Sequence, residues 1–172
     1  MERSAVFTSL SGWGAVTMGV TAVVAAPIAS RQPNVETWLG VWLTAALVAA
    51  GAGTFTIARK SARTAEHNLT RPAWNFVQSL FPSLLAGAVL TLVLYRAGQN
   101  GAIAGTWMLL YGSGIVTAGT VSVRLIPVMG LCFMGVGVVS LFAPAGWADV
   151  LMAAAFGGLH IVFGLVILRK YG

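Results

Sequence analysis

LIPVMGLCFMGVGVVSLFA, residues 125–143, is the stretch that decides the fold of this chain. It contains no charged side chain, and its length matches the roughly 20 apolar residues that a helix needs to cross the hydrocarbon core of a bilayer. An uncharged apolar run of this length predicts a transmembrane helix rather than the core helix of a soluble domain.

Five further stretches have the same character, and none has Asp, Glu, Lys or Arg in its middle third. We therefore predict an all-α fold, a polytopic transmembrane helical bundle of six spans that forms a single transmembrane helical domain over residues 1–172. The predicted spans are residues 7–28, 35–57, 73–95, 102–121, 125–143 and 148–168.

The composition agrees with a lipid environment. Hydrophobic residues make up 58% of the chain and charged residues only 8%, whereas a soluble domain carries about 25% charged residues. The net charge of +6 does not indicate a nucleic-acid partner, because the basic residues sit in short gaps between apolar runs instead of clustering on one soluble face. We expect the lipid bilayer to be the main partner, with no nucleic acid.

The gaps between spans predict the orientation of the chain in the membrane. If the N-terminus is inside, the only basic residues outside are Arg31 and Arg96, and the bias of Lys and Arg toward the cytoplasm favours this N-in, C-in arrangement. One alternative is that the first span is a signal peptide cut after Ala29, which would leave five spans with their loops on the same sides. The basic residues predicted inside are Arg3, Arg59, Lys60, Arg63, Arg71, Arg124, Arg169 and Lys170.

Tryptophans fall near the predicted span ends, as expected of an aromatic belt. The single cysteine, Cys132, cannot form an intramolecular disulfide, and we expect it to be a buried small hydrophobe. The chain has no ligand cluster of the zinc type, so we predict neither a metal nor a cofactor. The belt residues are Trp38, Trp107 and Trp147 at outer ends and Trp13 and Trp74 at inner ends.

The third span contains Pro82, which predicts either one bent helix that crosses the membrane or an interfacial turn that leads into a short tilted span. A polar cluster surrounds this proline. It is interpreted either as the inner vestibule of a solute site, since interrupted helices mark binding sites in transporters, or as a turn in the headgroup region. The cluster consists of Asn75, Gln78, Ser79 and Ser83.

His160 is the only titratable group near the middle of any predicted span, and such residues usually face the bundle interior. It shares a helix face with Ala153, Gly157 and Gly164, and small residues allow another helix to approach closely. We predict that His160 lies in a helix–helix contact. Two roles stay open: a neutral imidazole bonded to a neighbouring helix, or a group that handles a proton, metal or substrate.

A stripe of hydroxyl side chains follows one face of the fourth span, comprising Thr106, Ser113, Thr117 and Thr120. One interpretation is a polar wall of a solute or ion path, and the other is hydrogen bonding between packed helices. With His160, the residues Ser113, Thr117 and Thr120 form the candidate intramembrane polar site.

The segment Tyr111-Gly112-Ser113-Gly114, together with His160 two spans later, resembles the rhomboid intramembrane proteases. That family has six core spans, a Gly-x-Ser-Gly nucleophile motif on the fourth and a catalytic histidine on the sixth. The resemblance implies a Ser113–His160 dyad. The chain departs from the family at Tyr111, which stands where the motif has glycine, and in a second span without His or Asn.

The C-terminal third resembles small multi-pass inner-membrane proteins of bacteria that have no assigned activity. The matching residues are 130–135, 156–164 and 169–172, and the resemblance implies a location in the bacterial inner membrane. We predict a non-catalytic accessory or scaffold component that binds a membrane protein partner or forms a homo-oligomer, and no enzyme. The alternative is a subunit of a small-solute or ion transporter or channel.

Overall fold

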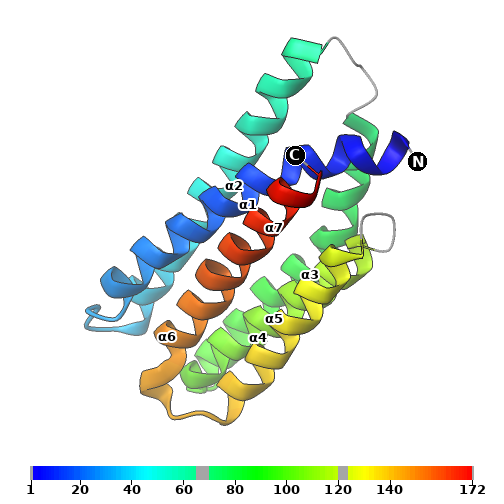
Figure 1. Cartoon of the computed structure of the whole chain (residues 1–172). Helices are drawn as coiled ribbons and strands as arrows, with labels where there is room; N and C mark the ends of the chain where they lie inside the picture. Colours follow the sequence, from blue (N-terminus) through cyan, green and yellow to red (C-terminus); the bar gives the residue numbers. More distant parts are fainter. Residues whose placement is uncertain (1, 65–69, 120–123, 172) are drawn as a thin grey trace. The chain divides into compact units, whose positions relative to one another are not determined.

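The computed structural model describes residues 2–64, 70–119 and 124–171, and within them the side chains of residues 12–55, 74, 76–119 and 124–170. Every regular element in these ranges is helical (Figure 1). Six helices are long and apolar enough to cross a membrane, which confirms the predicted number of such helices. The fold is therefore all-helical and compatible with an integral, multi-pass membrane protein.

The first five spans are single α-helices, and the sixth is a composite of short elements. A 3₁₀ turn, η2 (Asn100–Ala102), precedes α4, and another, η3 (Ala145–Trp147), precedes α6. The main elements are α1 (Glu2–Ala29), α2 (Val35–Thr64), α3 (Thr70–Arg96), α4 (Ile103–Gly119), α5 (Leu125–Phe142), α6 (Ala148–Met152), the π-helix η4 (Ala153–Leu159) and α7 (His160–Tyr171).

The chain divides into two compact units. Unit 1 comprises Met1–Trp74 and Phe156–Gly172, and so contains α1, α2 and α7. Unit 2 comprises Asn75–Ala155 and contains most of α3 together with α4, α5 and α6. The chain passes from one unit to the other twice, once near the start of α3 and once inside η4.

In unit 1, α1 is the central helix and packs against both α2 and α7. The connection to α2 is a short turn that Asn34 ends, since its side-chain Oδ1 accepts the backbone N–H of Thr37 at 2.9 Å. This bond satisfies one of the backbone donors that the first turn of any helix leaves without a partner, and it sets where α2 begins.

Glycines bring α1 and α7 into close contact. A Cβ atom placed on Gly19 would lie 2.7 Å from the carbonyl oxygen of Gly157, and one placed on Gly12 would lie 3.2 Å from that of Gly164. Residue numbers rise along α1 as they fall along α7, so the two helices are antiparallel. Small residues at these positions allow the backbones to approach without any help from a hydrophobic driving force, which lipid does not supply.

Unit 2 contains a second antiparallel pair of the same kind, α4 with α5. A Cβ on Gly112 would lie 2.6 Å from the carbonyl oxygen of Gly130, and one on Gly137 would lie 3.0 Å from that of Gly105. Large apolar side chains fill the space on either side of these contacts, and the fully buried ones are Phe133, Ile103, Met108 and Ile115.

The end of α3 is set by Gly98, which has φ +70°. The N–H of Gln99 bonds to the carbonyl of Leu94 at 2.9 Å, and the N–H of Gly98 bonds to that of Tyr95 at 3.1 Å. This is the Schellman arrangement, in which glycine accommodates the left-handed conformation without strain. It satisfies carbonyls that would otherwise face the bilayer without a donor.

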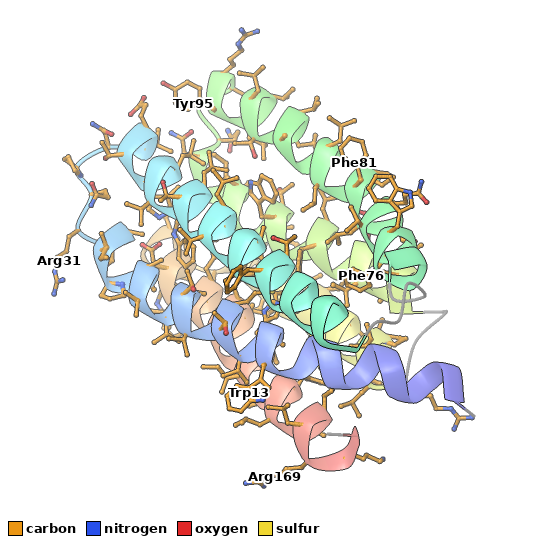
Figure 2. All side chains as sticks on the ribbon, turned by 90° about the horizontal axis from the view of Figure 1, so that it is seen from above. Trp13, Arg31, Phe76, Phe81, Tyr95 and Arg169 are labelled. Carbon is orange, nitrogen blue, oxygen red and sulfur yellow. The ribbon has the colours of Figure 1, made fainter. Side chains whose placement is uncertain are left out.

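Large apolar side chains cover the outside of the helices, as expected where lipid is the solvent. Leu47 on α2, Phe81 on α3 and Phe142 on α5 are all exposed, and Figure 2 shows Phe81 projecting outward from its helix. The predicted burial of Cys132 is wrong, because this residue is exposed on α5. The face of α5 that carries Gly130 and Gly137 is turned toward α4, which leaves Cys132 on the outer side.

Candidate functional site

His160 is buried within the helices, with 3% of its surface exposed. It is the first residue of α7, directly after the π-helix η4. Its Nδ1 lies 3.0 Å from the backbone carbonyl oxygen of Phe156, and the two rings stack with centroids 6.3 Å apart and planes at 14°. A carbonyl oxygen can only accept, so Nδ1 carries the hydrogen, and Nε2 of the neutral ring is an acceptor.

The contact of α7 with α1 surrounds this histidine. Gly157 and Gly164, one turn before and one turn after His160, are the two residues whose backbones approach α1. The face that carries the histidine is thus the face on which α7 packs against α1. The predicted small-residue face is a real helix contact, while the choice between a structural and a chemical role for His160 stays open.

The hydroxyl stripe of α4 belongs to unit 2 and is only partly enclosed. Thr106 and Ser113 are half-buried, whereas Thr117 is exposed and donates its hydroxyl to the carbonyl oxygen of Ser113 at 3.0 Å. Such a bond back to the preceding turn uses the hydroxyl donor within the helix. Thr120, the last member of the predicted stripe, lies outside the described residues.

The polar cluster of α3 is half enclosed as well. Ser79 and Ser83 are half-buried and Gln78 is exposed, while the side chain of Asn75 lies outside the described part of the chain. Of the two arrangements predicted for this span, the structure has one continuous helix with Pro82 inside it. Proline has no N–H, so Pro82 cannot donate to the carbonyl of Gln78 as another residue at this position would.

Unit 2 brings the polar cluster of α3 to the stripe of α4. A Cβ on Gly114 would lie 2.7 Å from Cδ1 of Leu80 and 3.1 Å from Oγ of Ser83, so glycine at this position lets α3 approach. Gly114 directly follows Ser113. The hydroxyl of Ser83 on α3 therefore lies beside the residue that follows Ser113 on α4, and we call Ser83, Ser113 and the Gln78 carbonyl the α3–α4 polar seam.

Trp107 was predicted as a belt residue, and it also anchors α3 to α4. Its indole N–H donates to the hydroxyl of Thr91 at 2.8 Å, and its ring lies against Gly87, where a Cβ would come within 3.2 Å of the ring. The spacing of Gly87 and Thr91, one turn apart on α3, was the available sequence signal. This spacing indicates a contact only once the partner helix, α4, is known.

Ser140 was not singled out from the sequence. It is buried on α5, and its Oγ has no hydrogen-bond partner in the described part of the chain. The threonines of the spans bond back to the preceding turn, as Thr17 does to Trp13 and Thr91 to Gly87. Ser140 differs from these threonines because its hydroxyl does not bond back to the preceding turn.

The proposed dyad joins the two units, since Ser113 belongs to unit 2 and His160 to unit 1. Each unit is described by itself, so the pairing of these residues stays a prediction. Among the described residues, no group of three or more His, Cys, Asp or Glu side chains could hold a metal ion.

Comparison with known proteins adds no relative from which an activity could be carried over. No protein-family model matches the chain, and neither a curated protein nor a solved structure matches it significantly.

Proposed function

We propose that this chain is a non-catalytic accessory or scaffold protein of the bacterial inner membrane, with both termini in the cytoplasm, and that it binds a transmembrane helix of another protein through α2. The exposed face of α2 is the observation that carries this proposal. We call it the α2 face, and it consists of Gly40, Thr44, Leu47, Gly51 and Thr54.

The glycines of the α2 face differ from those of the packed helices. A Cβ on Gly40 or Gly51 would meet no atom within 4 Å, whereas one on Gly112 or Gly19 would meet the backbone of a partner helix. Glycine lowers the helix propensity and offers lipid almost no apolar surface, so it has little use on a face that touches only acyl chains. A second helix that packs against this face would give the two glycines the role that glycines have elsewhere in the chain.

The spacing along the α2 face supports a helical partner. Its residues follow one another at intervals of four, three, four and three, the seven-residue repeat of two helices packed along their length. Trp42 and Ala49 are buried on the opposite side of α2, which is already used within unit 1. Small residues on one side and a bulky buried side chain on the other leave the α2 face available to a partner.

Photo-crosslinking in native membranes tests the proposal. A photo-reactive amino acid at Leu47 is expected to capture one discrete protein, whereas the same group at Val139 of α5, also exposed, captures only lipid. Gly40→Leu with Gly51→Leu should lower the Leu47 adduct about tenfold or more, since two small-residue contacts at roughly 1 kcal/mol each are lost. Gly135→Leu is the matched control, because Gly135 is equally open but lies on α5.

Three results would count against this proposal. Lipid adducts alone at Leu47, or an adduct that survives both leucines, would remove the α2 face as a docking site. An adduct of two copies of this chain would replace the separate partner by self-association. For the orientation, in a chain with Cys132→Ser, a membrane-impermeant thiol reagent on intact cells should label Arg31→Cys and Arg96→Cys but not Lys170→Cys.

A second candidate function is transport of a small neutral solute or ion, which the α3–α4 polar seam favours. The Ser83 hydroxyl lies beside Gly114, on the proline-containing part of α3 where the Gln78 carbonyl lacks its usual helical donor, and polar groups beside a local break in helix bonding resemble those of solute sites in transporters. Proteoliposomes exposed to osmotic gradients of glycerol, urea or KCl test it by light scattering. Solute entry that Ser83→Ala slows and Thr54→Val leaves unchanged would support transport, and entry no faster than in protein-free liposomes would exclude it for these solutes.

A further inference from the structure

The sixth span changes its hydrogen-bond register in the middle. It begins as an α-helix in α6, becomes a π-helix over the seven residues of η4, and returns to an α-helix in α7 (Figure 1, orange to red). A π turn bonds each carbonyl to the N–H five residues on instead of four, and such turns are rare, short and frequent at functional sites. A π segment inside a membrane span therefore needs a local cause.

His160 supplies part of that cause. In an α-helix, the carbonyl of Phe156 would accept the backbone N–H of His160, and in a π-helix it would accept that of the next residue. The imidazole Nδ1–H reaches the same carbonyl at 3.0 Å. In the π register the imidazole N–H takes the place at this carbonyl that the backbone N–H of His160 has in an α-helix, so the side-chain bond favours the π register.

Glycines make the segment adaptable. Gly157 packs on α1, where a Cβ would lie 2.6 Å from Cγ2 of Val23, while a Cβ on Gly158 would meet no atom within 4 Å. Two adjacent residues without side-chain restraint widen the range of backbone angles that the segment can adopt. The division of the chain into two units also falls inside η4, between Ala155 and Phe156.

We propose that η4 is a conformational switch between π and α registers, with the bond from His160 to the Phe156 carbonyl as its latch. Conversion to the α register turns α6 about the helix axis relative to α7 by about 100°, the rotation of one residue. It also lengthens the span, because an α turn holds fewer residues than a π turn. His160 in this role is a positioning residue for the backbone, independent of any partner of α2.

Distance measurements on the full chain in nanodiscs test the switch. With Cys132→Ser as background, spin labels at Val150 and Val166, both exposed, report the length of the sixth span by electron–electron double resonance. We expect two distances in the otherwise native chain. Gly158→Ala, which fits the open space and favours the α register, should raise the share of the longer distance about threefold.

Matched variants separate the switch from general stability. Gly135→Ala has the same open surroundings but lies within the α-helix α5, and it should leave the distribution unchanged. His160→Leu should also raise the longer distance, and His160→Asn should restore part of the native distribution, because its amide can donate to the same carbonyl. A single distance that neither Gly158→Ala nor His160→Leu moves would overturn the proposal.

Discussion

Both units pack two antiparallel helices against each other through glycines, although the surroundings of the two contacts differ. In unit 1, Gly12 and Gly19 of α1 face Gly164 of α7 and Gly157 of η4, and in unit 2, Gly105 and Gly112 of α4 face glycines of α5. Each set has the same seven-residue spacing, and each pair is antiparallel. Glycines at one residue per two turns let two helices approach over several turns, which is how helices associate when lipid removes the hydrophobic advantage of burying larger side chains.

Within each unit the two glycines differ in what limits the contact, and the two units differ in what lies beside it. In unit 2, backbone atoms of both helices limit the α4–α5 contact, since Gly112 faces the carbonyl of Gly130 and Gly130 faces the carbonyl of Gly112. The nearest atoms to Gly12 in unit 1 belong to the Leu168 side chain, just as those to Gly105 in unit 2 belong to the Leu141 side chain. The contact in unit 1 also has a histidine and a π-helix beside it.

The largest effect is expected for Gly112→Ala. The new methyl group would lie 2.6 Å from a backbone carbonyl oxygen and 2.9 Å from the backbone nitrogen of Met134, so α4 and α5 must separate. We expect the free energy of unfolding to fall by about 3 kcal/mol, the upper part of the range for overpacking. Denaturation in mixed micelles, followed by circular dichroism, measures it. Stability equal to that of Gly135→Ala would contradict the packing described for unit 2.

Gly12→Ala in unit 1 is expected to have a smaller effect, because Gly12 first meets a side chain. The added methyl group meets the end of the Leu168 side chain, which can rotate, before it meets the Gly164 carbonyl at 3.2 Å. We expect a loss of about 1 kcal/mol, measured in the same way. If Gly12→Ala proves as costly as Gly112→Ala, the Leu168 side chain does not move aside as expected.

A third prediction concerns the anchor between α3 and α4. Thr91→Val removes the hydroxyl that accepts the indole N–H of Trp107, and interhelical hydrogen bonds in membranes contribute about 0.6 kcal/mol on average. We expect a loss of that size, and a shift of the Trp107 fluorescence as its N–H loses an oriented acceptor. The emission should be recorded in a chain whose other tryptophans are replaced by phenylalanine. An unchanged spectrum and unchanged stability would show that the bond is not formed.

The smallest effect is expected for Thr117→Val. This side chain is exposed, and the hydroxyl bond to the carbonyl of Ser113 lies within its own helix. We expect a change within about 0.5 kcal/mol, typical of a surface position. A loss above 1 kcal/mol would mean that the hydroxyl stripe packs against another helix at this point.

The sequence predicted the features of the chain that depend on its lipid environment. Six apolar runs without a charged residue in their middle thirds, such as residues 125–143, predict six helices, because a bilayer leaves backbone groups no partner outside the helix, and this holds whatever the helices pack against. The small-residue face around His160 was also visible, since Gly157 and Gly164 share it by helical spacing alone. Six helices and one packed face could therefore be predicted from the sequence.

Other features depend on which helix lies opposite. The outward position of Cys132 follows from the face of α5 that meets α4, and hydropathy cannot identify that face in a run that is apolar all round. The chemistry of Trp107 predicts a place at a span end, but only its contacts with Gly87 and Thr91 show that it also joins α3 to α4. The π register of η4 could not be predicted, because a short apolar segment shows no periodicity that distinguishes a π-helix from an α-helix.

By itself, the sequence determined that this chain is a set of apolar helices with basic connections, because burying backbone in lipid admits few other structures. Only the tertiary structure decided which glycines meet partner backbones, which ones stay open on α2, and that the helix ahead of His160 changes register. The physical reason is that lipid determines whether a segment is helical, whereas the choice of partner depends on close fit between surfaces that are equally apolar.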